Sequence, residues 1–143
     1  MSENLQYLTP ELFLVIFNLS FLCMLLFVKS PLILLNSNQI SAVALIITAV
    51  LVYINPLKSD PIVNGFYTSN EFTAFFKMLV LFLSSVILYL SDTYLKKNNL
   101  LKYEFPILIN FCVFGMMIVI SSNDLMTLYL GIEIQSLSLY IIA

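Results

Sequence analysis

The chain has 143 residues, of which 61% are hydrophobic and only 10% are charged, and its mean hydropathy is +1.01. Soluble domains carry about 25% charged residues, so this composition excludes a soluble domain and indicates a membrane protein. The six cations are scattered lysines and there is no histidine. A basic stripe for nucleic acid and an imidazole metal site are therefore both excluded.

Five apolar runs are separated by short polar breaks, and each is close to the roughly 20 residues that a helix needs to cross a hydrocarbon core of about 30 Å. Lipid offers the backbone no hydrogen-bond partners, so spanning segments form helices. We expect a single all-α membrane domain over 1–143. Its helices are expected at about residues 10–28, 36–54, 72–90, 105–121 and 124–143.

Two polar breaks stand out between these runs. The linker 55–70 contains Pro56, Pro61 and Gly65, which predict a structured loop with turns. The stretch SDTYLKKNNLLKYE after the third run is the most polar part of the chain and is expected to be a loop. Only the short break SSND separates the last two helices, so these two should be antiparallel neighbours.

The lysines indicate which side of the membrane each loop faces. Four of them lie after helices one and three: Lys29, Lys96, Lys97 and Lys102. Lys58 lies in the opposite loop, with Glu3 and Glu11 near the amino end. Because lysines are enriched in loops on the inner side of a membrane, we expect the N-terminus outside and the C-terminus inside.

The fifth run, NDLMTLYLGIEIQSLSLYIIA, carries a carboxylate near its centre. Glu133 lies nine residues beyond Asp124, about 13–14 Å along a helix, which is close to the midplane. An ionised group there costs at least about 2.5–3.5 kcal/mol. Two readings remain: a structural carboxyl held protonated or hydrogen-bonded, and a proton-relay carboxylate, which we favour because such residues are rare and costly.

The helical wheel places polar residues on two opposite faces of this helix. One stripe consists of Tyr129, Glu133, Ser136 and Tyr140; the opposite stripe consists of Thr127, Gly131, Gln135 and Ser138. Neither face suits lipid, so we expect protein on both sides. We expect Tyr129, Gln135, Ser136 and Tyr140 to support the proton path through Glu133.

Lys77 is a second charge inside an apolar run, about one and a half turns into the third helix. One reading is that its long side chain extends to the membrane surface. The other is a structural or relay ion pair with a partner in another chain. Lys77 is therefore a second candidate for proton translocation.

The stretch KYEFPILINFCVFGMMIVISSNDLMTLYLGIEIQSLSLYIIA, residues 102–143, resembles helices four and five of the antiporter-like subunits of respiratory complex I, and within that family the subunit-two branch. The FFK of Phe75–Lys77 is similar to the third helix of that branch. Over residues 1–70 the similarity is one of topology. The resemblance implies a membrane-arm subunit of a proton-translocating NADH:ubiquinone oxidoreductase in the mitochondrial inner membrane, with the N-terminus on the intermembrane-space side.

In the family, the glutamate that matches Glu133 lies on the proton path and is coupled to a lysine on a later, broken helix. The resemblance also implies that no cofactor binds this chain, and that NADH, FMN, iron–sulfur clusters and ubiquinone are held by other subunits. Expected partners are membrane lipids and other membrane-arm subunits, but no nucleic acid.

The family fold contains two inverted five-helix repeats, the first of which would begin near residue 104. The chain contains only two helices of that repeat, so we expect a second polypeptide to carry the later helices and the lysine. Two alternatives remain: a subunit of a multi-subunit cation/proton antiporter, and a purely structural membrane component that has lost pumping.

Overall fold

The structure is a computed structural model that describes residues 2–28, 30–62, 64–98 and 104–143. Six helices and two short strands follow in chain order. The helices are α1 (Ser2–Tyr7), α2 (Thr9–Phe27), α3 (Pro31–Ile54), α4 (Glu71–Lys97), α5 (Glu104–Ser121) and α6 (Leu125–Ile142). The strands, β1 (Lys58–Ile62) and β2 (Tyr67–Ser69), form an antiparallel hairpin between α3 and α4.

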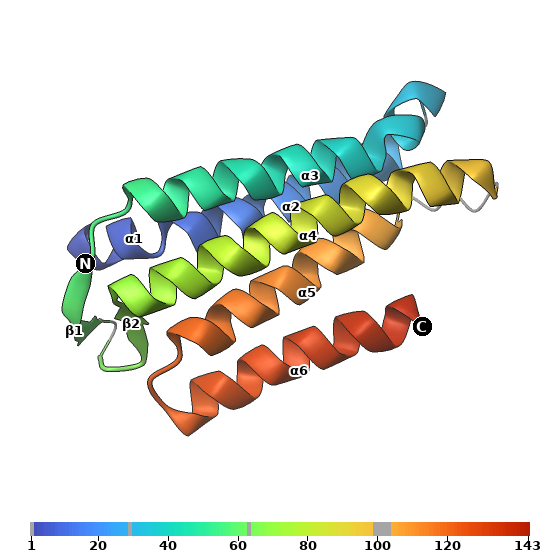
Figure 1. The fold of residues 1–143 in the computed structure, drawn as a ribbon. Coiled ribbons are helices and arrows are strands. Elements are labelled where there is room, and N and C mark those ends of the chain that lie inside the picture. The colour runs from blue at the N-terminus through green and yellow to red at the C-terminus, as the bar shows by residue number, and fades with distance from the viewer. Residues whose placement is uncertain (1, 29, 63, 99–103) are drawn as a thin grey trace.

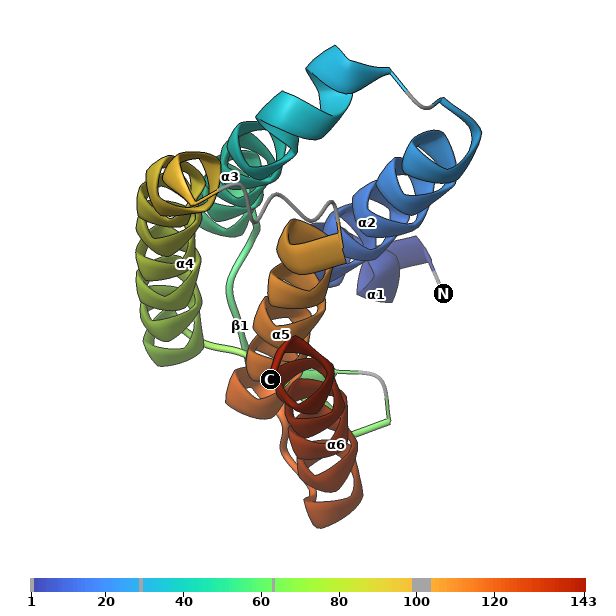
Figure 2. The same ribbon diagram turned by 90° about the vertical axis from the view of Figure 1, so that its right-hand side faces the viewer.

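Within the described residues, five helices are long and apolar enough to cross a membrane. This confirms the prediction of an all-α membrane protein. The long helices run alternately up and down, so the hairpin lies at the N-terminal end of the bundle and the C-terminus lies at the other end (Figure 1). Helices α2 to α5 form a group, and α6 lies outside it, beside α5 (Figure 2).

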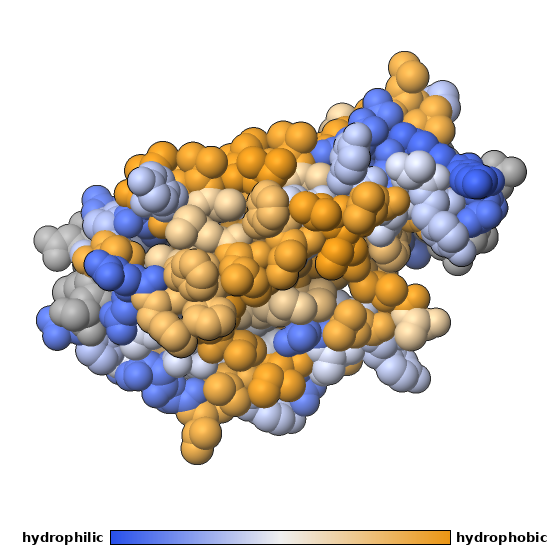
Figure 3. All heavy atoms as spheres, in the orientation of Figure 1, coloured by the Kyte–Doolittle hydropathy of each residue, from blue (hydrophilic) through white to orange (hydrophobic). Residues whose placement is uncertain are grey.

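Apolar side chains fill the interior of α2 to α5 and also cover much of its outside. The core residues Leu45, Leu81, Leu88 and Met117 are at most 1% exposed and belong to one cluster across α3, α4 and α5. On the face drawn in Figure 3, hydrophobic residues occupy the middle and hydrophilic residues gather toward the two ends. This distribution suits a bundle whose middle lies in hydrocarbon.

Two helices are longer than the hydrophobic pattern suggested. Helix α3 begins at Pro31, five residues before the expected start, because proline suits the first turn of a helix. Helix α4 continues to Lys97 instead of ending near residue 90. Its last turns are stabilised by Asp92, which is buried and accepts hydrogen bonds from Lys96 at 2.7 Å and from Gln39 of α3 at 3.2 Å.

The linker predicted to be a turn-rich loop is the β-hairpin. Asn64 and Gly65 form its tip with φ of 55° and 90°, a region that asparagine and glycine tolerate best. The hairpin does not stand alone, because Tyr67 also forms an antiparallel bridge with Ser122 in the turn between α5 and α6. The hairpin thus reaches the point where α6 begins.

Of the loop lysines used to predict the orientation, Lys29 and Lys102 lie outside the described residues. Lys96 and Lys97 end α4 at the end of the bundle opposite the N-terminus (Figure 1).

Candidate functional site

Glu133 lies halfway along α6, the helix that carries the predicted proton path. Asp124 precedes the first residue of α6, and its carboxylate accepts a hydrogen bond from the Thr127 backbone N–H at 3.0 Å and so caps the first turn. The helix packs mainly on α5. One of its two predicted polar faces is therefore covered by this chain and the other is not.

The covered face is the stripe that contains Gly131 and Ser138, both of which are buried. A methyl group added to Gly115 of α5 would lie 2.9 Å from the backbone nitrogen of Gln135 and from the carbonyl oxygen of Gly131. These distances leave no room for a side chain. The two helices therefore approach closely at paired glycines, as small residues at membrane helix contacts permit.

The other stripe faces away from α5. Tyr129 is 61% exposed, Tyr140 is 83% exposed and Ser136 is exposed. Glu133 is partly exposed, and its carboxylate interacts electrostatically with the Tyr129 side chain. The structure thus brings Tyr129 to Glu133, whereas Gln135 lies half-buried beside α5 and Tyr140 points outward.

Two ion pairs are formed in the part of the chain that the structure describes: Lys77 with Glu11, and Lys96 with Asp92. Neither includes Glu133. Lys77 is only 4% exposed, so the prediction that its side chain extends to the membrane surface is wrong. The alternative, an ion pair, is present, but its partner is Glu11 of the same chain and not a residue of another chain.

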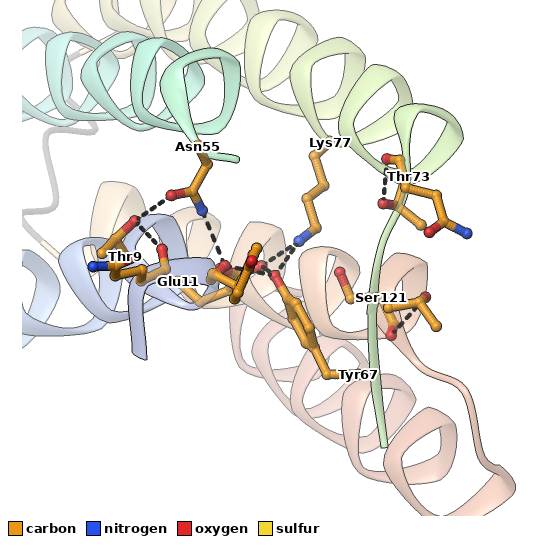
Figure 4. Close-up of polar contacts among 11 residues, drawn as sticks. Thr9, Glu11, Asn55, Tyr67, Thr73, Lys77 and Ser121 are labelled. Atoms are coloured by element: carbon orange, nitrogen blue, oxygen red, sulfur yellow. Dashed lines mark hydrogen bonds and ion pairs between the residues drawn. The ribbon is translucent and has the colours of Figure 1, made fainter. Parts of the chain in front are cut away.

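Lys77, Glu11 and Tyr67 form a compact hydrogen-bonded group, which we call the buried triad (Figure 4). The Lys77 ammonium bonds to Glu11 Oε1 and donates to the Tyr67 hydroxyl at 2.7 Å. The Tyr67 hydroxyl lies 2.9 Å from Glu11 Oε1 and 3.1 Å from the carbonyl oxygen of Tyr7, and can donate its proton to either. All three side chains of the triad are less than 9% exposed.

Further bonds connect the triad to the surrounding helix ends. Asn55, which follows α3, donates to the Tyr7 carbonyl at 3.0 Å and lies 3.0 Å from the Thr9 hydroxyl (Figure 4). Burial raises the pKa of the Tyr67 hydroxyl well above its ordinary value, and the negative charge of Glu11 raises it further. Tyr67 therefore remains a neutral hydrogen-bond donor at neutral pH.

Sequence reasoning missed the triad because it counted Glu11 only as a charge near the amino end and assigned it no partner. The structure places Glu11 in the first turn of α2, on the stripe that continues through Leu14, Asn18 and Phe21 into the core. This 3–4 spacing was the available signal. The contact to Lys77 spans 66 positions, and no local pattern indicates which helices meet.

The hairpin strand that supplies Tyr67 also holds the turn into α6. The Asn123 backbone N–H donates to the Phe66 carbonyl at 3.1 Å, and its side chain donates to the Gly65 carbonyl at 2.8 Å. The Thr68 hydroxyl donates to the Ser121 carbonyl at 3.3 Å. Gly65, Phe66 and Thr68 of the hairpin thus contact the residues that lead into the helix of Glu133.

The remaining chemistry of the described chain is sparse. Its described residues contain no group of three or more histidine, cysteine, aspartate or glutamate side chains that could hold a metal ion. A cavity of about 590 Å³ runs between α2 and α6. Its lining is almost wholly apolar, with Glu11 and Tyr67 at one side, so its chemistry suits hydrocarbon and not a polar ligand.

Comparison with known proteins identifies relatives across most of the chain, although no protein-family model matches it. The chain is 36% identical to NADH-quinone oxidoreductase subunit N of Pelagibacter ubique, over 99% of its own length and 30% of that protein. It is 34% identical to subunit N of Paramagnetospirillum magneticum over 94% of its length and 27% of that protein. The chain thus spans less than a third of the relatives it matches.

Proposed function

The chain belongs to the family of NADH-quinone oxidoreductase subunit N, the bacterial counterpart of the subunit-two branch of complex I, and from this premise we propose that it carries protons across a membrane through Glu133. It acts within the membrane arm of a proton-translocating NADH:quinone oxidoreductase. The observation that carries the proposal is a carboxylate halfway along a spanning helix, on the face that this chain leaves uncovered.

The chemistry of such a carboxylate suits alternating proton binding and release. Burial among apolar groups favours the protonated form, and a cation that approaches favours the ionised form. In the described residues both paired lysines are bound to other acids. The cation that controls Glu133 is therefore supplied across the exposed stripe of α6, on which Tyr129 lies near the carboxylate.

In this proposal, Lys77 is a member of the buried triad and is not the partner of Glu133. It lies near the N-terminal end of the bundle, and its charge is balanced by Glu11. A buried pair of this kind can exchange a proton with its neighbours only when the pair opens. We therefore assign the main relay step to Glu133.

The proposed setting is a mitochondrial inner membrane, with the N-terminus in the intermembrane space. Support for this orientation comes from Lys96 and Lys97, which end α4 at the opposite end of the bundle and would face the inner side. The proposed partners are other membrane-arm subunits and membrane lipids, with the later helices of the same subunit carried by a second polypeptide. Cofactors are assigned to other subunits.

The test is the replacement Glu133→Gln in the assembled enzyme, with proton translocation and NADH oxidation measured in the same vesicles. Glutamine keeps the size and polarity of the side chain but cannot release a proton, so we expect fewer protons translocated per NADH oxidised. Glu104→Gln is the matched control, because Glu104 is an exposed carboxylate in the first turn of α5. Wild-type translocation in Glu133→Gln would leave Glu133 as a structural carboxyl.

A further inference from the structure

We infer that the buried triad of Glu11, Lys77 and Tyr67 positions the start of α6, and thereby sets the location of Glu133 in the bundle. The inference rests on the proposed function of Glu133. It concerns three residues that do not contact Glu133 and that act through the hairpin. A continuous series of contacts connects the triad to the first turn of α6.

The first step is the fixation of the Tyr67 side chain. Its hydroxyl accepts a hydrogen bond from Lys77 at 2.7 Å and lies 2.9 Å from Glu11, so two helices, α2 and α4, hold one strand residue. Hydrogen bonds to charged groups are stronger than those between neutral groups. Glu11 and Lys77 have little access to water, so each charge depends on the other for its compensation.

The second step is the backbone of the same strand. Tyr67 is bridged to Ser122, and Phe66 accepts the backbone N–H of Asn123. Side-chain bonds from Asn123 to Gly65 and from Thr68 to Ser121 reinforce this contact. Tyr67, whose side chain belongs to the triad, therefore lies within the segment that contacts the turn between α5 and α6.

The third step is the helix itself. Residues 122–124 connect directly to α6, and Asp124 caps its first turn. Beyond this turn α6 is held mainly by α5 through the paired glycines. A helix that is fixed at its start and at one close contact has a defined depth and rotation. If the contact with the hairpin is lost, α6 is free to turn about the contact between Gly115 and Gly131.

Tyr67→Phe in the assembled enzyme tests the inference, because phenylalanine keeps the ring and removes only the hydroxyl with its bonds to Glu11, Lys77 and the Tyr7 carbonyl. We expect faster hydrogen–deuterium exchange at the backbone amides of residues 122–128 and a fall in protons translocated per NADH. Tyr53→Phe is the matched control: Tyr53 lies near the end of α3, at the same end of the bundle, and is 78% exposed. Tyr53→Phe should change neither the exchange at residues 122–128 nor the number of protons translocated per NADH.

A second variant protects the test against a general loss of structure. The exchange of positions in Glu11→Lys/Lys77→Glu keeps an oppositely charged pair beside Tyr67. It should restore translocation that is lost in Glu11→Lys alone. Failure of Tyr67→Phe and of the exchanged pair to assemble would make the triad a folding element only and would overturn the inference.

Unchanged exchange at residues 122–128 in Tyr67→Phe would also overturn it, as would faster exchange with unchanged translocation. Glu133→Gln separates this inference from the proposed function. If Glu133→Gln translocates normally, the function of Glu133 fails, whatever the triad does. If Glu133→Gln is defective while Tyr67→Phe is normal, the function stands and the positioning role fails.

Discussion

Glu11 and Glu133, two acids in spanning helices, have opposite surroundings. Glu11 is only 5% exposed and meets a lysine and a tyrosine of its own chain, whereas Glu133 meets Tyr129 and no described cation. A carboxylate that is permanently paired is a poor proton carrier, because its partner holds it in the ionised form. The residue left without a cation is the one that can change its protonation when a cation arrives.

The coupling between Glu11 and Lys77 predicts an unusual stability pattern. Lys77→Met leaves a buried carboxylate without its cation, which costs about 3–5 kcal/mol, whereas removal of both charges from a buried pair is often nearly neutral. We expect Lys77→Met to lower the thermal stability of the assembled complex more than Glu11→Gln/Lys77→Met does. Lys97→Met, at an exposed lysine of the same helix, is the control. Equal losses in the single and double variants would contradict a coupled pair.

Residue type alone was enough to single out Glu133 and Lys77, because charged residues are costly in the hydrocarbon layer. It could not identify the partner of Lys77. That partner is set by the way in which α2 and α4 approach each other through the hairpin, a contact between segments far apart in the chain. No described ion pair includes Glu133, and its expected lysine partner stays a prediction.

At the scale of elements, the closest contact joins α5 and α6 at Gly115 and Gly131. Both glycines were visible in the sequence, and so was the pattern of small residues that indicates close packing of membrane helices. The strands of the hairpin and the last turns of α4 were not predicted. Both receive additional contacts from other parts of the chain: Ser122 bridges to Tyr67 of the hairpin, and Gln39 donates to Asp92 of α4.

Replacement of these glycines should have unequal consequences. A Cβ at Gly131 would lie 2.7 Å from the Val119 side chain, but a Cβ at Gly115 would meet backbone atoms of α6 at 2.9 Å. Overpacking of this kind costs about 1–3 kcal/mol. We expect Val119→Ala to restore part of the thermal stability lost in Gly131→Ala, and none of that lost in Gly115→Ala. Equal rescue of both would show that the helices separate easily.

At the scale of the molecule, α6 is the least enclosed of the five spans. Only 11% of its apolar segment is buried, against 33–44% in the other four spans, and its mean hydropathy of 1.5 is the lowest of the five. A helix that is both more polar and more exposed is poorly suited to lipid. We therefore expect other protein segments to cover this face in the assembled enzyme.

This predicts a difference between two exposed positions in the assembled enzyme. A photo-activated cross-linking residue at Ser136, on the uncovered polar stripe, should capture another protein segment, and we expect that segment to be a helix with a lysine in its apolar part. The same residue at Phe82 of α4, which is 65% exposed in apolar surroundings, should capture mainly lipid. Mass spectrometry of the products identifies the partner, and lipid adducts alone at Ser136 would contradict the prediction.

The turn of three residues between α5 and α6 also bears on how the chain enters the membrane during synthesis. Helix α6 carries Glu133 into the hydrocarbon layer and has a mean hydropathy of only 1.5, whereas that of α5 is 2.0. Because their backbones touch at two glycines, α5 can shield one side of α6 as soon as both have left the ribosome. The two helices should therefore enter the membrane together as a helical hairpin, with the apolar first helix assisting the polar second one.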